Sequence, residues 1–197
     1  MQLINYYQLT RSQKEEFVVF LKETSKEILQ PAHENMWDND WQNKNNTLLY
    51  LLENTSRFSG YGMYNVLFDG GKVIACSGIY TSAFCRDLAI AGTRTWVRKD
   101  YRHLSIAREQ LLPAEKKWAI AHGFKGIAVC FNDYNKNMSK LWNRVRLGEN
   151  RTPRQPRHMF YNGVNTLPFP VTIQHTKQWV IYEKLDPLFD FDWTQLI

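Results

Sequence analysis

Residues 95–112 read TWVRKDYRHLSIAREQLL and decide how the rest of the chain is interpreted. They predict a strand that ends at Val97, a polar turn, and a helix that begins near Ile106. A turn that enters a helix exposes unpaired backbone N–H groups at the positive end of the helix dipole, and such groups bind phosphates. The amides from His103 to Ala107 are therefore candidate donors to a diphosphate. The plainer alternative is a strand-to-helix connection with a serine cap at Ser105.

The helix after this turn is predicted to run from Ile106 to His122, with Gly123 just past its end. Pro113 interrupts the pattern, because a proline inside a helix removes one hydrogen bond. The apolar face expected from regular helical spacing contains Ile106, Leu111, Ala114, Trp118 and Ala121.

Upstream of residue 95, the pattern predicts a strand over 2–9, an amphipathic helix that stops before Pro31, and a short helix over 47–53. Residues 63–68 and 72–80 form a predicted hairpin around Asp69-Gly70-Gly71, which is a turn and not a phosphate loop. A third strand is expected over 88–98. The amphipathic helix is expected to bury Phe17, Phe20, Leu21, Thr24 and Ile28.

Downstream, residues 125–131 are a short apolar run that is typical of a strand buried on both faces. A helix is expected around Met138 and Leu141, followed by a loop over 148–156 and strands over 157–164 and 173–185. Residues 186–192 are acidic and aromatic and are expected to pack as a final arm.

These motifs together resemble the GNAT superfamily of N-acetyltransferases. In that family a strand ending in Val is followed by Tyr-Arg, a glycine-containing turn, then Ile and a helix with Leu-Leu. Two features depart from the pattern: Ser105 and Ala107 stand at glycine positions, and His103 stands where Gly commonly follows Tyr-Arg. A serine is strained if the turn requires a positive φ. The residues in register are Val97, Tyr101, Arg102, Ser105, Ile106, Ala107, Leu111 and Leu112.

A second match to the family lies after the buried strand, where the chain reads NKNMSKLW from Asn135 to Trp142. The resemblance implies that Asn135 contacts the pantetheine arm, with a helix cap as the alternative. The family's thiolate-protonating Tyr is replaced by Trp142, whose indole N–H is a donor but not a usable acid. Trp142 is therefore expected to pack against the cofactor arm or the core. Tyr134 is the tentative acid, and the alternative is that the thiolate leaves unaided.

The resemblance implies an α/β (α+β) fold: a single domain over 1–197 with a mixed, mostly antiparallel sheet, helices on both faces, and splayed strands at a cofactor cleft. It also implies an acetyl-CoA-dependent N-acyltransferase whose acceptor is a small-molecule or peptide amine. The backbone N–H of Val97 is the expected oxyanion contact. No Glu lies between Asp87 and Lys99 to act as base, which leaves Asp87, Tyr80 or a water chain. The expected cofactor-binding set is Trp96, Val97, Arg98, Arg102, His103, Leu104, Ser105, Ile106, Ala107, Asn135 and Trp142.

The alternative function is a catalytically inactive GNAT-fold module that uses its basic face to bind nucleic acid or protein. The replaced Tyr and the missing glycines favour it, whereas Asn135 and Tyr101-Arg102 favour the enzyme. Five arginines, broken by two prolines, are expected to form a mobile surface loop near the open end of the cofactor cleft, where they raise the positive potential for the cofactor's phosphates or for an acidic acceptor. The plainer alternative is a solvated loop, and nucleic acid is not the expected partner. They are Arg144, Arg146, Arg151, Arg154 and Arg157.

The composition is compatible with both functions. The chain has 197 residues, 25 Lys and Arg against 19 Asp and Glu, and a net charge of +6, which suits anionic partners in general. Its three cysteines show neither disulfide nor zinc spacing, so free thiols and no metal are expected. Without an apolar leader or a membrane-length segment, a cytoplasmic location is expected, and a homodimer is compatible with the resemblance. His33, His122 and His175 are scattered and are interpreted as structural.

Overall fold

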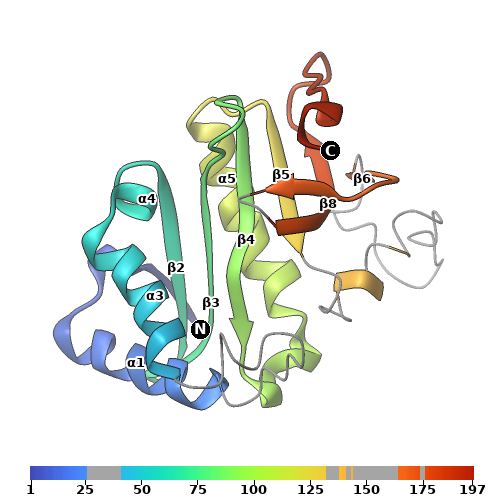
Figure 1. Cartoon of the computed structure of the whole chain (residues 1–197). Helices are drawn as coiled ribbons and strands as arrows, with labels where there is room; N and C mark the ends of the chain where they lie inside the picture. The colour runs from blue at the N-terminus through green and yellow to red at the C-terminus, as the bar shows by residue number, and fades with distance from the viewer. Residues whose placement is uncertain (26–40, 132–137, 141–142, 144–163, 174–175) are drawn as a thin grey trace. The chain divides into compact units, whose positions relative to one another are not determined.

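The computed structural model describes residues 1–25, 41–131, 138–140, 143, 164–173 and 176–197. Its eight-stranded sheet has the order β1-β2-β3-β4-β5-β8-β6, and β7 pairs with β8 off this path (Figure 1). The described chain divides into two compact units. The first contains Met1–Tyr80 and Gly92–Glu115, and the second contains Thr81–Ala91 and Lys116–Ile197.

An antiparallel meander forms the sheet of the first unit. β1 (Gln2–Asn5) pairs with β2 (Gly62–Asp69), which pairs with β3 (Lys72–Thr81) through the predicted turn. Gly70 and Gly71 both have a positive φ, at 56° and 82°, as a tight hairpin turn requires. The predicted hairpin is therefore confirmed.

Three helices cover one face of this meander: α1 (Arg11–Ser25), α3 (Trp41–Asn54) and α4 (Ser56–Ser59). They share a core with Tyr64 and Val66 of β2 and Cys76 of β3. The predicted apolar face of α1 is confirmed as far as it is described, while Ile28 lies outside the described residues. The buried residues of that face are Phe17, Phe20, Leu21 and Thr24.

The opposite face of the meander packs against the helix after the turn at 98–105. A 3-10 helix, η3 (Lys99–Leu104), leads to a π-helical stretch, η4 (Ala107–Leu111), which continues into α5 (Leu112–Ala121). The N–H of Leu112 donates to the carbonyl of Ala107, five residues back. This wider turn lies directly before Pro113, which has no N–H to donate to a regular helix.

That π turn shifts the buried face of the helix away from the predicted one. Leu111, Glu115 and Ala119 are fully buried, four residues apart, whereas Ala121 is exposed. The predicted face was wrong from Ala114 onward, because a π turn inserts one residue into the helical repeat and rotates the remainder of the helix by about 100°.

β4 (Leu88–Val97) runs parallel to β5 (Gly126–Phe131), with Leu88, Ala89 and Ile90 as the paired residues. Farther along β4, Gly92 and Arg94 both have a positive φ, at 66° and 53°. The regular extended backbone is therefore interrupted twice within this strand. Together with the antiparallel pairs, the parallel pair confirms the predicted mixed sheet.

In the second unit, β8 (Thr176–Lys184) pairs antiparallel with β5, with β6 (Val164–Thr166) and with β7 (Val171–Ile173). The predicted terminal arm packs by its aromatic residues. The ring of Trp193, in the 3-10 helix η5 (Trp193–Leu196), lies 4.9 Å from that of Phe191 and 5.6 Å from that of Tyr182.

Three element boundaries differ from the prediction. The first strand ends at Asn5, whose side chain accepts the N–H of Tyr7 and starts a 3-10 helix, η1 (Tyr6–Gln8). The predicted helix over 47–53 begins earlier, at Trp41. β7 was not predicted as a strand distinct from β8, and residues 157–163 of the predicted strand lie outside the described residues.

The three cysteines are free thiols, as predicted. Across the described ranges, no helix is both long and apolar enough to span a membrane.

Candidate functional site

The candidate site is the connection between β4 and the helix that begins at Ile106, and its residues belong to the first unit. The backbone N–H of Arg98 donates to the carbonyl of Ile74 at 2.8 Å, which fixes the end of β4 to β3. Ser105 then reverses the chain with a left-handed conformation, φ 53° and ψ 31°. The sequence identified this position as one that a glycine would suit, and the structure confirms the positive φ.

The amides at the start of the helix are available for a ligand. The N–H of Ser105 donates weakly to the carbonyl of Arg102, at 3.3 Å. Within the described part of the chain, the N–H groups of Ile106 and Ala107 have no backbone acceptor. The buried side chain of Ile106 packs with Leu111 against Leu67 and Ala75, so these amides belong to a helix start that is anchored in the core. Two adjacent donors at a helix start can bind an anion.

Two arginines near the turn have different surroundings. The guanidinium of Arg98 donates to the carbonyl of Val73 and forms ion pairs with Glu16 and Glu23, and its side chain is only 12% exposed. Arg102 is exposed and its Nε donates to the carbonyl of Val97 at 3.0 Å. Arg102 is therefore the better placed of the two to meet an anionic ligand.

Tyr101 fastens the turn to the hairpin. Its hydroxyl donates to Oδ2 of Asp69 at 3.1 Å. This hydrogen bond to a carboxylate raises the pKa of the Tyr101 hydroxyl. Tyr101 thus positions the turn and remains protonated at neutral pH.

The other predicted residues on this segment differ in exposure. His103 and Leu104 are exposed on η3, whereas Trp96 and Val97 are half-buried against the two faces of the meander. Tyr134, Asn135, Trp142 and the five arginines from Arg144 to Arg157 lie outside the described residues, as do His33 and His175.

The candidate bases Asp87 and Tyr80, and also His122, each interact with a neighbouring residue. Asp87 lies in the second unit, about half exposed, and pairs with Lys125 at 2.9 Å. Tyr80 lies in the first unit beneath the guanidinium of Arg57, 4.9 Å from its ring centroid. His122 stacks on Trp118 and its Nδ1 lies 2.8 Å from that residue's carbonyl oxygen, which agrees with the structural interpretation.

Sequence reasoning missed one titratable group beside β4. Glu115 is fully buried, and its Oε2 accepts the N–H of Gly92 at 2.8 Å. Burial raises the pKa of this carboxyl from 4.5 to about 8, against hydrogen bonds from Ser77 and Gly92 that lower it. The signal in the sequence was Pro113: it shifts the helical phase and brings residue 115 to the buried side.

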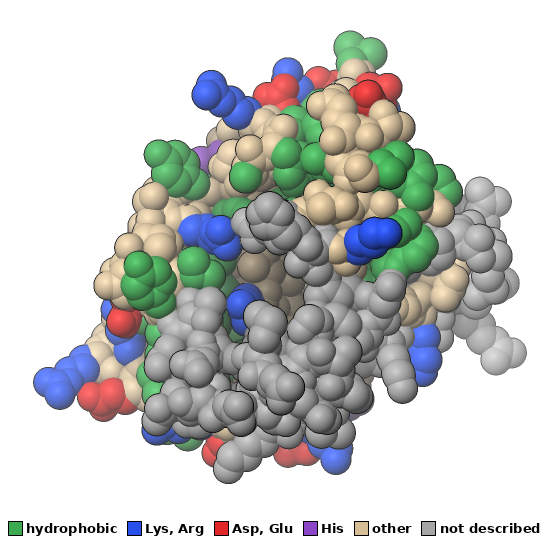
Figure 2. Space-filling model, viewed as in Figure 1, with side chains coloured by type: hydrophobic (Ala, Val, Ile, Leu, Met, Phe, Trp, Pro, Cys, Tyr) green, Lys and Arg blue, Asp and Glu red, His purple; other side chains and the backbone are tan. Residues whose placement is uncertain are grey.

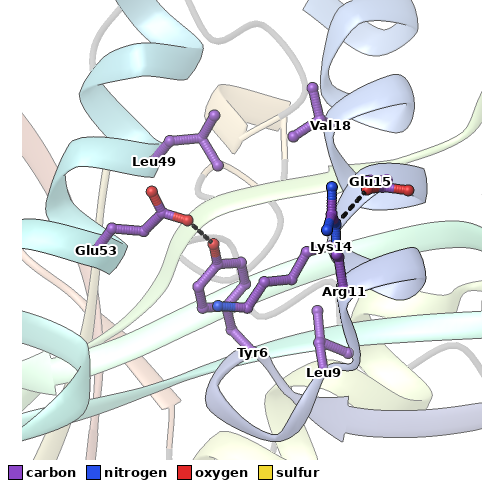
Figure 3. A pocket seen from close by; sticks show the side chains of 8 residues that line it. All are labelled: Tyr6, Leu9, Arg11, Lys14, Glu15, Val18, Leu49 and Glu53. Atoms are coloured by element: carbon purple, nitrogen blue, oxygen red, sulfur yellow. Dashed lines mark hydrogen bonds and ion pairs between the residues drawn. The ribbon is translucent and has the colours of Figure 1, made fainter.

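A separate cavity of about 450 Å³ lies among η1, α1 and α3 (Figure 3). Tyr6 donates its hydroxyl to Glu53 at 2.7 Å, and the ammonium of Lys14 lies 4.7 Å from the centroid of the Tyr6 ring. Arg11 pairs with Glu15 at its rim. The charges that line this cavity therefore already interact with one another.

The arrangement of the sheet and its helices matches that of many solved acetyltransferases. A GNAT-family acetyltransferase from Staphylococcus aureus Mu50 superposes with a TM-score of 0.56 over 94% of this chain and 99% of its own, at 16% identity. The chain has the GNAT fold.

Two further structures with the GNAT fold carry more specific names. PaiA N-acetyltransferase from Thermoplasma acidophilum, in complex with coenzyme A, gives a TM-score of 0.54 at 13% identity and covers 93% of this chain and 99% of its own. Ribosomal-protein-alanine N-acetyltransferase from Brucella melitensis gives 0.55 at 12% identity, with 94% and 100% covered. No protein-family model matches the sequence, and no curated protein matches it either.

Proposed function

We propose that this chain is an acetyl-CoA-dependent N-acyltransferase that acetylates a primary amine, with residues 1–197 acting as one catalytic domain. The observation that carries the proposal is the pair of amides at Ile106 and Ala107 that have no backbone acceptor among the described residues, at the start of a helix that comes after β4 in a GNAT fold. Two of the structures that share this fold are named as N-acetyltransferases, and one of them holds coenzyme A.

The residues of the turn fit a diphosphate. The amides of residues 103–107 supply the donors, of which Ile106 and Ala107 are the two with no backbone acceptor in the described chain. Exposed Arg102 adds a positive charge, while Arg98 supports the turn through its ion pairs with α1. The missing glycines do not close the site, because Ser105 adopts the left-handed conformation that a glycine would supply.

In this proposal β4 orients the acetyl group. The N–H of Val97 donates to the thioester oxygen, which stabilises the negative charge that develops there. Asn135 contacts the pantetheine arm, Trp142 packs against it, and Tyr134 protonates the departing thiolate. Acetyl-CoA, when bound, supplies the activated acetyl group, and the amine attacks it directly.

The acceptor is a primary amine on a small molecule or on a peptide. One structure with the same fold is named for a polypeptide acceptor, the alanine of a ribosomal protein. Figure 2 shows lysine and arginine side chains of the described residues at several separate places on the face drawn. The binding-module alternative has less support because two structures that share this fold are named as N-acetyltransferases. We therefore favour the enzyme.

The direct test is binding of acetyl-CoA, measured by calorimetry and by thermal stability. At 100 times its dissociation constant, a ligand that binds only the folded state stabilises it by about 2.7 kcal/mol. Ala107→Pro deletes one of the two amides at Ile106 and Ala107, in the first turn of a helix, where no intrahelical hydrogen bond is lost. We expect it to weaken acetyl-CoA binding at least about tenfold, the size of a lost hydrogen bond to a charged group.

Ser12→Pro is the matched control, because Ser12 is the second residue of α1, which packs on the other face of the meander from the helix that begins at Ile106. It should leave acetyl-CoA affinity unchanged while making the same backbone change. If the unchanged protein shows no binding, or if both proline variants bind equally well, the proposed phosphate site is wrong.

A further inference from the structure

A chain of hydrogen-bonded side chains links β4 to the buried carboxyl on α5. The hydroxyl oxygens of Thr95 on β4 and Ser77 on β3 lie 2.5 Å apart. The Ser77 hydroxyl also hydrogen-bonds to the Glu115 carboxylate. All three residues belong to the first unit, and burial increases along the chain: Thr95 is half-buried, whereas Ser77 and Glu115 are completely buried.

The direction of these hydrogen bonds is set by the number of protons. When Glu115 is ionised, Ser77 donates its one hydroxyl proton to the Glu115 carboxylate. The bond between Thr95 and Ser77 must then be donated by Thr95. The oxygen of Thr95 consequently keeps a lone pair to accept a proton from a group next to β4.

Two polar atoms next to these hydrogen-bonded side chains lack a hydrogen-bond partner among the described residues. They are Oε1 of Glu115 and Nδ2 of Asn65, and both are buried. Asn65 lies opposite Ser77 in the β2–β3 register, so their side chains share one face of the sheet. A side chain that served only to accept the N–H of Gly92 would not need a second buried oxygen without a partner, since an unsatisfied buried polar group is costly.

We propose that Glu115 receives the proton released by the acceptor amine, by way of the Thr95 and Ser77 hydroxyls. The inference rests on the proposed transferase function, which puts the reacting groups beside Val97, two residues after Thr95. Glu115 acts through the two hydroxyls and is therefore a positioning residue, whereas Thr95 is the group that meets the amine.

Atoms and electrons balance in this step. The amine nitrogen forms a bond to the acetyl carbonyl carbon, and the C–S bond breaks with its electron pair on sulfur. The extra amine proton passes to Thr95, the Thr95 proton passes to Ser77, and the Ser77 proton passes to the Glu115 carboxylate. Glu115 ends as a neutral acid, a form that its buried surroundings favour.

The other titratable groups near Glu115 come from β2, β3 and β4. Tyr64 and Cys76 both have a raised pKa because they are buried, and both stay neutral at pH 7. Arg94 on β4 is the cation whose charge, like that of Glu115, acts on Tyr64. Glu115 is accordingly the group of this cluster that changes charge near neutral pH, with its pKa of about 8.

The test compares Glu115→Gln, Ser77→Ala and Thr95→Val, with Thr95→Ser as the matched control that keeps the hydroxyl. The acceptors are alkyl polyamines and short peptides with a free N-terminus, and the readouts are acetyl-CoA affinity and the pH profile of kcat. We expect the first three variants to lower kcat by about 100-fold, in the range of general-base catalysis, with acetyl-CoA affinity and the KM for the amine nearly unchanged. Thr95→Ser should keep most of the activity.

The pH profile separates proton transfer from structural support. The amine's own deprotonation produces a rising limb in every variant, so the diagnostic feature is the additional limb with a midpoint near 8, which Glu115→Gln should abolish. The ¹³C signal of the Glu115 carboxyl should titrate with the same midpoint, and this reading needs no acceptor.

The outcomes distinguish the two proposals. If the unchanged protein does not bind acetyl-CoA, the transferase and this inference fall together. If it binds and turns over, but Glu115→Gln or Thr95→Val keeps the kcat and the limb near pH 8, the inference alone is wrong. Thr95→Val also keeps the test valid if Glu115→Gln does not fold.

Discussion

Ser105 adopts a left-handed backbone conformation that usually falls to glycine. Its left-handed backbone allows the turn to expose the next two amides, but a side chain in this conformation costs about 1–2 kcal/mol. The sequence allowed this strain to be foreseen, because Ser105 occupies a glycine position of the motif. The ion pairs of Arg98 could not be foreseen, since Glu16 and Glu23 lie more than seventy residues away in the sequence.

Ser105→Gly should therefore stabilise the protein. Glycine removes the strain and costs some entropy in the unfolded chain, which leaves a net gain of about 0.5–1 kcal/mol in the free energy of unfolding. Urea denaturation measures it. Ser105→Ala keeps the strain and should show no gain; a loss of stability in Ser105→Gly would contradict the explanation.

Substitution of the two arginines beside the turn should affect different properties: Arg98 the stability of the protein, and Arg102 its affinity for acetyl-CoA. Arg98→Gln leaves Glu16 and Glu23 without their cation and should cost about 2 kcal/mol of stability, discounted for the partial exposure of both carboxylates. Arg102→Gln should leave stability within about 0.5 kcal/mol and weaken acetyl-CoA binding severalfold. Equal effects of the two substitutions on stability would show that the distinction is wrong.

At the scale of elements, hydrophobic periodicity predicted the helix after the turn but not which of its faces is buried. Its existence, its start near Ile106 and its end before Gly123 were predicted. Its buried face was not, because regular spacing has no place for the extra residue that the π turn inserts before Pro113. The missed Glu115 is a direct consequence: at a regular helical phase, residue 115 belongs to the polar side.

Two alanines on this helix distinguish the observed phase from the predicted one. Ala119 is completely buried, and Ala119→Leu should destabilise the protein by about 1–3 kcal/mol through overpacking. Ala121 is exposed, and Ala121→Leu should change stability by no more than about 0.5 kcal/mol. Thermal or urea unfolding of the two variants measures both effects. If Ala121→Leu destabilises the protein more than Ala119→Leu, the buried face is the predicted one and not the observed one.

At the scale of the whole molecule, the order of elements was predictable, because the hairpin, the turn with its helix, and the short apolar strand each carry a local signal. The pairing of β7 with β8 and the backbone reversals at Gly92 and Arg94 depend on contacts distant in sequence and were not predicted. The pH dependence of stability likewise depends on one residue that the sequence did not single out.

Glu115 should make the protein less stable as the pH rises. Its pKa is about 8 when folded and near 4.5 when unfolded, so between these values the folded chain binds more protons than the unfolded chain. The free energy of unfolding should therefore fall by a few kcal/mol between pH 4.5 and 8. Glu115→Gln should remove this part of the slope, measured by urea unfolding across that window; identical slopes would show that Glu115 is not the group responsible.

The pairing of β5 with β8 has a consequence for synthesis on the ribosome. β5 ends at Phe131, but its antiparallel partner is complete only at Lys184, about fifty residues later. At the usual translation rates this is a delay of roughly 3–10 s, during which the apolar edge of β5 has no neighbour on that side. A nascent chain that stalls between these points therefore presents an open strand edge, and chaperone capture is expected to be strongest in that interval.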